Sequence, residues 1–397
     1  MKILMVNYEY PPLGGGGGLV ARDIVEEMSV QGHNVTVVTS CSQGLKTHES
    51  INGVDVYRVP VLFRKDTQVA NIPSMFLYPP SCIFTALRQF TRKSFEIINT
   101  HFAVPSGPAG FVLSKIFQIP NVLSIHGGDI FDPSKASSPH KTSLVSNVVR
   151  LMLKTANRVV ASSTDTKNNA YKYYHIKRAI DIIPLGIKKP KFEKSARSDF
   201  GLKSDEFVFC TIGRLVRRKN IDDTLEVLSR LGDYNYQFLI IGDGPERRHL
   251  ENLTKTLHLD NRVKFLGSVS DEVKFQVLAL SDVYLSTAMH EGFGLVFLEA
   301  MESGLPIVCY DRGGQIDFLV SGETGYLVNL GDKRTFRERL LSIINDSESR
   351  NAISRNNRQL IKNFYIERCA ERYISLFEEV VRTDYSGDRD ENVKARY

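Results

Sequence analysis

Short apolar runs alternate with helix-forming segments along nearly the whole chain, and this alternation restricts the fold more than any other feature. The first repeat comprises an apolar run at 2–7, a glycine-rich loop, apolar residues at helical spacing over 19–30, and a second apolar run at 35–39. Parallel strands need a crossover helix between them, and strands buried on both faces have continuous apolar sequences. The pattern therefore predicts an α/β protein built on parallel sheets.

The same alternation begins again in the second half of the chain. Residues 188–198 are rich in lysine and proline and poor in apolar side chains, which is typical of a segment between domains. We therefore expect two doubly wound, Rossmann-like domains, at 1–187 and 188–365. A helix at 366–383 is expected to pack back on the N-terminal domain, and the charged tail at 384–397 is predicted to be disordered.

Composition excludes several classes of protein. The net charge of +6 is small for 397 residues, and no helix-turn-helix, zinc-finger or RNA-binding signature occurs, so we expect no nucleic-acid partner. The five cysteines are widely spaced without a Cys-x-x-Cys pair, which favours a reducing compartment over a disulfide framework. The N-terminal apolar run ends at Asn7, too early for a signal peptide, and no run is long enough to span a membrane. We expect a cytoplasmic protein.

The stretch 290–304 carries the strongest chemical signal. It predicts a loop that becomes a helix at Leu295 and ends at Gly304. A helix N-terminus presents unpaired N–H groups and a positive dipole end, which suit a phosphate. Glu291 precedes the helix and Glu299 lies inside it, and carboxylates accept hydrogen bonds from hydroxyls. The pattern indicates a ligand with hydroxyls at both ends and phosphate between; the alternative is an amphipathic helix with solvated acids.

Two further turns between a strand and a helix are suited to phosphate. After the apolar run 207–212 come Arg214 and Lys219, whose cations can bind a diphosphate. The glycine loop 14–18 offers converging N–H groups, although its spacing does not match the dinucleotide fingerprint. The alternatives are a solvated basic turn and a flexible glycine linker.

Two histidines follow apolar runs in the first half of the chain. His126 comes directly after the run 121–125 and is followed by two glycines, which open the backbone to a ligand, so it is the better functional candidate. For His101 the sequence favours neither a structural nor a functional role. The only Asp-x-Asp pattern is at 388–390 in the charged tail, where we attribute it to coincidence, so we expect no metal site.

The segment 58–93 interleaves cations with aromatic and aliphatic residues. It contains six lysines and arginines but only one acid, Asp66. Such a segment can lie on an anionic membrane surface, so we expect peripheral contact with the inner face of a membrane. The alternative is an ordinary helix that faces the core and has a basic outer side.

With these residues assembled, the chain resembles the large retaining glycosyltransferase family 4, whose members have the GT-B fold. The match covers essentially the whole chain. The stretch 290–306 looks like the family's Glu-x7-Glu signature, which is specific where it follows a strand and opens a helix. Further matches are the opening at 11–16 with 32–35, the turn at 213–214 with 219–220 and, more weakly, 242–245 and 265–267.

The resemblance implies a donor site in the second of two domains that face each other across a cleft. Glu299 would bind the ribose of a sugar nucleotide. Glu291 would hold the donor sugar and the adjacent phosphate, together with the backbone of Phe293, Gly294 and Leu295.

The resemblance also implies roles at the departing group. Arg214 and Lys219 would neutralise the departing diphosphate. Gly15 and Gly16 would approach the diphosphate and the acceptor from the first domain, and His126 would hydrogen-bond the donor sugar near its reacting carbon.

The implied activity is that of a retaining, metal-independent hexosyltransferase without a cofactor. It would move a sugar from a nucleotide-sugar donor to a saccharide or lipid-linked acceptor, in cell-envelope glycan or glycolipid synthesis. A sugar-nucleotide epimerase of the same architecture is the alternative. Departures from the family pattern, at Gly18, Lys188, Ser286–Thr287 and Asp317, leave the donor residues intact. The expected catalytic residues are His126, Glu291, Arg214 and Lys219.

Overall fold

The chain forms two compact units. Unit 1 comprises Met1–Gly186 together with Ile366–Tyr397, and unit 2 comprises Ile187–Tyr365. Within the part of the chain that is described, no helix is both long enough and apolar enough to cross a bilayer. The computed structural model describes residues 1–62, 64, 71–135 and 138–394, without the side chains of 385–394.

Unit 1 is built on an eight-stranded sheet with the order β3-β4-β2-β1-β5-β6-β7-β8. All neighbouring strands in it are parallel except β3 and β4. The strands are β1 Lys2–Asn7, β2 Asn34–Ser40, β3 His48–Ile51, β4 Val54–Val59, β5 Ile97–His101, β6 Asn121–Ile125, β7 Arg158–Ala161 and β8 Asp181–Ile182.

The antiparallel edge strand β3 was not predicted. It joins β4 through a turn at Asn52 and Gly53, both of which have positive φ, 49° and 79°. Asn-Gly is the favoured pair for such a hairpin turn because both positions require this conformation. The sequence prediction missed the strand because a short, partly exposed edge strand has no continuous apolar run.

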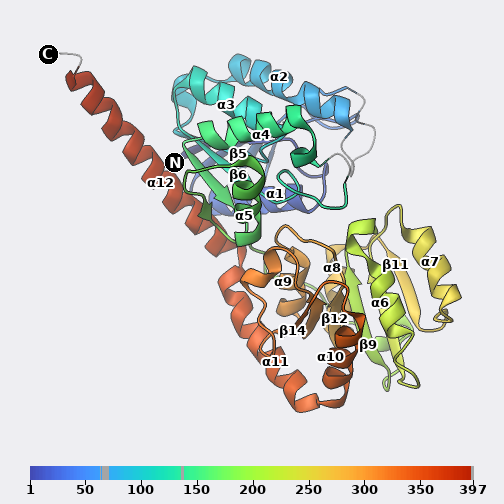
Figure 1. Ribbon diagram of the computed structural model, residues 1–397. Helices are drawn as coiled ribbons and strands as arrows, with labels where there is room; N and C mark the ends of the chain where they lie inside the picture. Colours follow the sequence, from blue (N-terminus) through green and yellow to red (C-terminus); the bar gives the residue numbers. More distant parts are fainter. Residues whose placement is uncertain (63, 65–70, 136–137, 395–397) are drawn as a thin grey trace. The chain divides into compact units, whose positions relative to one another are not determined.

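Helices cover both faces of the unit 1 sheet. α2, α3 and α4 lie side by side as the uppermost layer in Figure 1, and α1 packs along α12 on the other side. Leu4, Val6 and Val38 of the central strands pack with buried side chains of α2 and α3. The helices are α1 Gly16–Val30, α2 Ile72–Gln89, α3 Ser106–Phe117, α4 Ser143–Thr155, α5 Thr164–Tyr174 and α12 Ile366–Lys394.

Helix α12 is longer than the sequence indicated. It belongs to unit 1, where Tyr373 donates a hydrogen bond to Ser124 and Glu379 pairs with Arg158. The helix is described as far as Lys394, beyond the expected end at 383, and the expectation of a disordered tail stays a prediction. Extending a helix that is already nucleated costs little, and no proline interrupts the charged segment. A lack of apolar residues therefore does not end a helix whose first turns are anchored.

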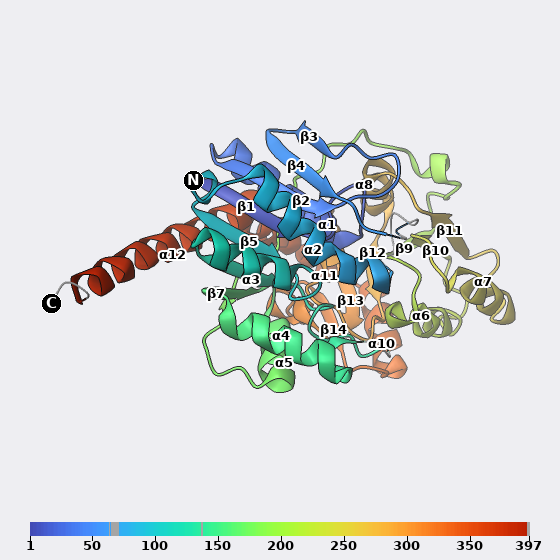
Figure 2. The ribbon, with the colours of Figure 1, turned by 90° about the horizontal axis from the view of Figure 1, so that it is seen from above.

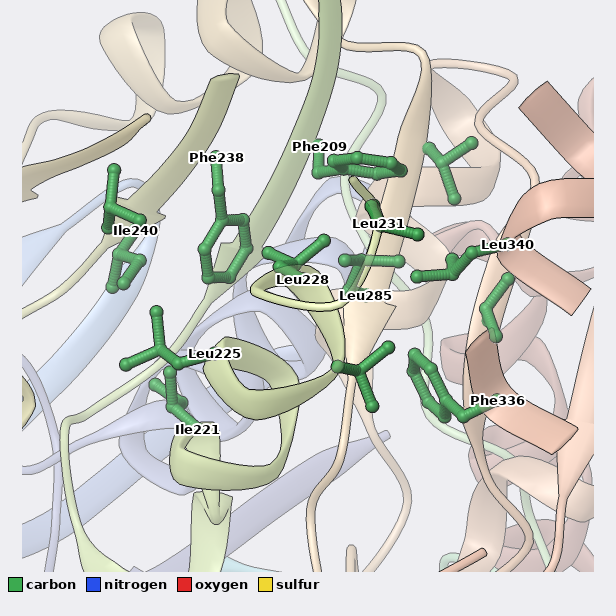
Figure 3. Packing of buried hydrophobic residues seen from close by; sticks show 14 of the residues in the cluster. Phe209, Ile221, Leu225, Leu228, Leu231, Phe238, Ile240, Leu285, Phe336 and Leu340 are labelled. Carbon is green, nitrogen blue, oxygen red and sulfur yellow. The ribbon is translucent and has the colours of Figure 1, made fainter. Parts of the chain in front are cut away.

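Unit 2 is built on a fully parallel six-stranded sheet with the order β11-β10-β9-β12-β13-β14. Its main core packs Phe209, Phe238 and Leu285 of the sheet against α6 and α10 (Figure 3). The elements are β9 Phe207–Ile212, α6 Ile221–Leu228, β10 Tyr236–Ile241, α7 Arg247–Thr256, β11 Val263–Gly267, α8 Asp271–Leu280, β12 Val283–Ser286, α9 Leu295–Glu302, β13 Ile307–Tyr310, β14 Gly325–Val328, α10 Lys333–Asn345 and α11 Ser347–Leu360.

Each sheet contains one point where the order of strands reverses. In unit 1 this point lies between β1 and β5, and in unit 2 it lies between β9 and β12. Helices that follow the two strands go to opposite faces there, which leaves a crevice at the carboxyl ends where α/β sheets bind ligands. The prediction of parallel α/β sheets in both halves is confirmed, and the topology directs attention to the loops after these strands.

Candidate active site

In unit 2 the loops after β9 and β12 are joined by hydrogen bonds. The Met289 N–H donates to the carbonyl of Arg218 at 2.9 Å, and the Thr287 hydroxyl donates to the carbonyl of Asn220 at 2.7 Å. Arg218 also donates to the carbonyl of His290. These bonds hold the basic turn against the loop that carries Glu291.

Glu291 is 6% exposed and is paired with two cations. Its Oε1 lies 2.5 Å from Lys219 Nζ and its Oε2 lies 3.0 Å from Arg218 Nη1. Burial alone would raise the pKa of this carboxyl, but the two cations outweigh burial and lower the pKa to about 2. Glu291 is therefore a carboxylate at any working pH, a weak base, and an acceptor whose negative charge is already balanced.

Two glycines allow this close packing, because a side chain at either position would collide with Glu291 or Lys219. The turn after β13 docks on Glu291, whose carbonyl accepts from the Gly314 N–H at 2.8 Å. Gly313 has a φ of 119°, and a Cβ there would lie 2.1 Å from the Glu291 carbonyl oxygen. A Cβ on Gly213 would lie 2.7 Å from Cε of Lys219.

The N-terminus of α9 begins beside Glu291. Gly294 caps the helix with a φ of 93° and provides no side-chain hydrogen bond, so the first N–H groups of α9 have no capping side chain. Phe293 is 4% exposed and packs on Phe318, with ring centroids 5.2 Å apart. The side chain of Phe293 thus anchors the loop that leads into α9.

Glu299 lies in the second turn of α9 and is paired with Lys274 of α8. Lys274 Nζ lies 2.6 Å from Glu299 Oε1 and 2.8 Å from Asp271 Oδ1. Burial raises the pKa of Glu299, and the Lys274 cation offsets part of this effect. Sequence reasoning missed Lys274, because nothing local distinguishes a lysine inside a helix 25 residues before its partner.

Arg214 differs from Arg218 and Lys219, which both pair with Glu291. Its side chain is exposed, and no ion pair joins it to another described residue. Arg218, by contrast, holds Glu291 and was not among the predicted site residues, although it stands in the basic run at 217–219. Arg214, like the exposed Arg217 of the same turn, is therefore a cation that a ligand phosphate can reach without displacing a carboxylate of the described residues.

In unit 1 the glycine loop after β1 leads directly into α1. Gly15 is the N-cap and Gly16 is the first helical residue; both are exposed. A Cβ built on either glycine would meet no atom within 4 Å, and neither residue has a positive φ. Protein packing therefore does not require glycine at these two positions, in contrast to Gly14, whose φ is 100° and whose Cβ would lie 2.6 Å from Glu9.

We expect Gly16→Ala to retain or slightly raise stability while lowering activity by about tenfold or more. Alanine at a helical position favours the folded state by roughly 0.4–1 kcal/mol, so any loss of activity reports on a ligand that approaches the backbone. Thermal unfolding and initial rates check this expectation. Gly14→Ala is the contrasting variant, because it is expected to lose stability. Unchanged activity in Gly16→Ala would remove this residue from the site.

His126 follows β6 and is held by a turn that sequence reasoning did not assign. The carboxylate of Asp129 accepts from the His126 N–H at 2.9 Å and from the Ala103 N–H at 2.8 Å. Burial lowers the pKa of His126 to about 4, so this imidazole is neutral at physiological pH. His126 Nε2 lies 3.0 Å from Nδ1 of His101, which is fully buried.

The predicted site residues thus form two sets. In unit 2 the structure brings Glu291 together with Lys219. Glu291 lies on the loop that precedes α9, and Glu299 lies on α9 itself. Gly15, Gly16 and His126 belong to unit 1.

Comparisons with known proteins agree with this geometry. A family model described as Glycosyltransferase Family 4 matches residues 14–189, and one described as Glycosyl transferases group 1 matches residues 192–360. The chain is 27% identical to N-acetyl-alpha-D-glucosaminyl L-malate synthase of Bacillus anthracis, over 98% of this chain and 100% of that protein. It is 24% identical to alpha-monoglucosyldiacylglycerol synthase of Acholeplasma laidlawii, over 96% of this chain and 98% of that protein.

A solved structure has a similar fold. HepE (Alr3699) of Anabaena, in complex with UDP and glucose, aligns with a TM-score of 0.77 and 20% identity. The alignment covers 96% of this chain and all of the other.

Proposed function

The chain belongs to family 4 of the glycosyltransferases, the group 1 enzymes of the GT-B fold, and from this premise we propose what it transfers and how. The reaction is the retaining transfer of a hexose-type sugar from a nucleotide sugar to a saccharide or lipid-linked acceptor, in cell-envelope glycan or glycolipid synthesis. The observation that carries this proposal is the ion-paired Glu291 beside the uncapped N-terminus of α9.

The charges of this site suit the departure of a diphosphate. Breaking the bond between a sugar and a nucleotide builds negative charge on the leaving phosphate, and fixed cations and helix N–H groups stabilise that charge. Arg214 is exposed and has no ion pair with the described residues, Lys219 follows it on the same loop after β9, and α9 offers its first N–H groups. These groups supply the positive charge that a metal ion supplies elsewhere, so we propose that transfer needs no metal.

The state of Glu291 supports a mechanism without a covalent intermediate. Retaining glycosidases use a carboxylate as nucleophile. A carboxylate with a pKa of about 2, held by two cations, is a poor nucleophile and a poor base. Glu291 is better suited to accept hydrogen bonds from hydroxyls of the donor sugar, and retention then follows from attack on the face that the diphosphate leaves.

Glu299 is suited to the ribose of the donor. Its charge is balanced by Lys274, and it lies in the second turn of α9, about one turn from the N-terminus that we propose binds phosphate. The Anabaena protein was solved with UDP, which supports a UDP-sugar as the donor. The names of the two relatives give different products, a glycosylated malate and a glucosylated diacylglycerol, so they support acceptors of different chemistry.

Product analysis with a panel of UDP-, GDP- and ADP-sugars tests the proposal. We expect one donor to yield nucleoside diphosphate and a glycoside of unchanged anomeric configuration, equally with and without EDTA. An inverted product would overturn retention, and loss of activity in EDTA would overturn metal independence. Conversion of the donor into its epimer without acceptor would establish the epimerase alternative instead.

The outer side of α2 indicates where a lipid-linked acceptor is reached. Ser74, Tyr78, Cys82 and Ala86 face the core, and the opposite side exposes apolar residues at the same spacing. This helix belongs to the layer that faces the viewer in Figure 2. The exposed apolar side chains of α2 are Ile72, Phe76, Phe84 and Leu87, which are 63%, 65%, 67% and 44% exposed.

Fewer cations are exposed beside this apolar side of α2 than the sequence indicated. Arg58 and Arg64 are 2% and 4% exposed, so they do not reach the surface. Lys65 and Asp66 lie outside the described residues. The cations that remain exposed are Arg88, Arg92 and Lys93 at one end of α2. An apolar helix face with cations beside it matches an anionic bilayer surface, so we propose peripheral attachment to the inner face of the membrane.

We expect Phe76→Ser combined with Phe84→Ser to lower binding to anionic vesicles by at least about tenfold, because each phenylalanine loses roughly 1.5–3 kcal/mol of burial. Flotation with phosphatidylglycerol vesicles, compared with phosphatidylcholine alone, measures this. Val320→Ser is the matched control, because Val320 is an exposed apolar residue of unit 2. Equal flotation by the double variant and the control would contradict the attachment.

A further inference from the structure

His126 stands at the end of a series of buried hydrogen bonds in unit 1. His126 Nε2 lies 3.0 Å from His101 Nδ1, and His101 Nε2 lies 2.7 Å from Asn99 Oδ1. His101 and Asn99 are 0% and 1% exposed. Because these side chains are buried from bulk solvent, we assign the protons in the series from their protein partners.

The orientation of the Asn99 amide is determined by its other neighbours. Asn99 Nδ2 lies 3.2 Å from the Val122 carbonyl and 3.0 Å from the Ser124 hydroxyl. A backbone carbonyl only accepts, so the NH₂ of the amide must face Val122 and its oxygen must face His101. Tyr373 of α12 donates to the same Ser124 hydroxyl at 3.1 Å, which closes the series on the side away from His126.

The amide then determines the tautomer of both histidines. Asn99 Oδ1 only accepts, so His101 Nε2 carries a proton and donates it. Burial keeps the pKa of His101 well below its ordinary value, so the ring is neutral and its Nδ1 is an acceptor. His126 Nε2 must therefore be the donor to His101, which leaves His126 Nδ1 without a proton.

The lone pair on His126 Nδ1 accepts no hydrogen bond from the described part of the protein. The atom is buried, and no described group lies within hydrogen-bond distance of it. Phe102 lies against the His126 ring, with centroids 4.8 Å apart, and a Cβ on Gly17 would meet Phe102 at 2.5 Å. The acceptor thus lies one side chain away from the start of α1 and the glycine loop.

We propose that His101 is a positioning residue that holds His126 in the Nε2–H tautomer, so that the bare Nδ1 accepts a hydroxyl hydrogen of the bound sugar. The inference rests on the proposed function for the identity of the sugar. An acceptor nitrogen selects hydroxyl groups and rejects carboxylate and phosphate oxygens, which have no hydrogen to donate. His101 therefore helps to decide which part of the substrate His126 receives.

Nuclear magnetic resonance of the full-length protein with ¹⁵N-labelled histidine tests the proposal without substrate. At neutral pH we expect His126 to show a protonated Nε2 and an unprotonated Nδ1, with its signals assigned by their loss in His126→Gln. In His101→Phe we expect averaging between the two tautomers. In His101→Asn the amide oxygen can take the place of the imidazole Nδ1, so the Nε2–H tautomer is expected to return.

Kinetics separate positioning from a purely structural role. We expect kcat/KM to fall roughly five- to tenfold in His101→Phe, the effect of one misdirected hydrogen bond, and to recover at least partly in His101→Asn. Melting temperatures of both variants control for damage to the core. Equal losses of kcat/KM in the two variants would mean that only packing matters.

Two spectra would overturn the inference. One is a wild-type His126 with the proton on Nδ1, and the other is an unchanged His126 tautomer in a folded His101→Phe protein. Absence of transfer by the wild-type protein with every nucleotide sugar would instead count against the proposed function, because the spectra decide the role of His101 without any reaction.

Discussion

Replacement of Lys219 by alanine is expected to lower kcat/KM for glycosyl transfer by about 10²–10³-fold, the effect of removing one preorganised group that stabilises developing charge. Lys219 lies on the loop after β9, one of the two strands between which the strand order reverses, and its ammonium group is 2.5 Å from Glu291. Initial rates at saturating acceptor measure the loss. Lys255→Ala, at an exposed position of α7, is the control for removing a lysine from unit 2.

The pairing of Lys219 with Glu291 gives this prediction a second, independent readout. Both side chains act on one network, so their effects should not add. We expect Glu291→Gln combined with Lys219→Ala to be far less damaging than the product of the single losses. Additive losses would show that the two residues act separately, and activity within twofold of wild type in Lys219→Ala would remove this lysine from the reaction.

Glu299→Ala is expected to weaken binding of the donor nucleotide by roughly ten- to hundredfold, because hydrogen bonds to a charged group contribute about 1.5–3 kcal/mol. Of the three carboxylates on the loop and helix that follow β12, Glu299 is the one that pairs with α8 rather than with the basic turn or Tyr365. Isothermal titration with UDP measures the change. Glu302→Ala is the matched control, because Glu302 lies on the same helix and bonds instead to Tyr365.

The Lys274→Met variant tests how the affinity for the nucleotide depends on pH. Burial raises the pKa of Glu299 and the Lys274 cation offsets part of that rise, so removing the cation must raise the pKa further. Protonated Glu299 loses part of its acceptor capacity, so nucleotide affinity should fall as pH is lowered, beginning at a higher pH in Lys274→Met than in wild type. Parallel pH profiles would show that Lys274 does not control the charge of Glu299.

The residues that we propose bind the donor could be selected from the sequence because their signals are local. Glu291, Gly294 and Glu299 stand within nine residues of one another, and a loop, a positive φ and a helix turn are properties that neighbouring residues determine. The alternation of apolar runs with helical segments predicted the parallel sheets for the same reason. The short hairpin strand β3 escaped because its residues form no continuous apolar run.

Burial reversed the interpretation of several polar residues. Arg58 and Arg64 were counted with a basic surface, yet both lie inside unit 1, where Arg58 pairs with Glu49. His101 was left open between two roles, and only its position between His126 and Asn99 shows what it can do. Residue type indicates what a group can bind, but its partners depend on which distant segments pack beside it.

The sequence by itself determined that the chain alternates strands and helices in two halves, and that a carboxylate stands on each side of a helix N-terminus. Only the tertiary structure decided that Lys274 balances Glu299, that Arg218 and Lys219 together hold Glu291, and that Asn99 orients the histidines. Local structure follows from interactions between near neighbours in sequence, which periodicity records. The charge state of a buried group follows from partners that lie 25 to 72 residues away, which only packing brings into contact.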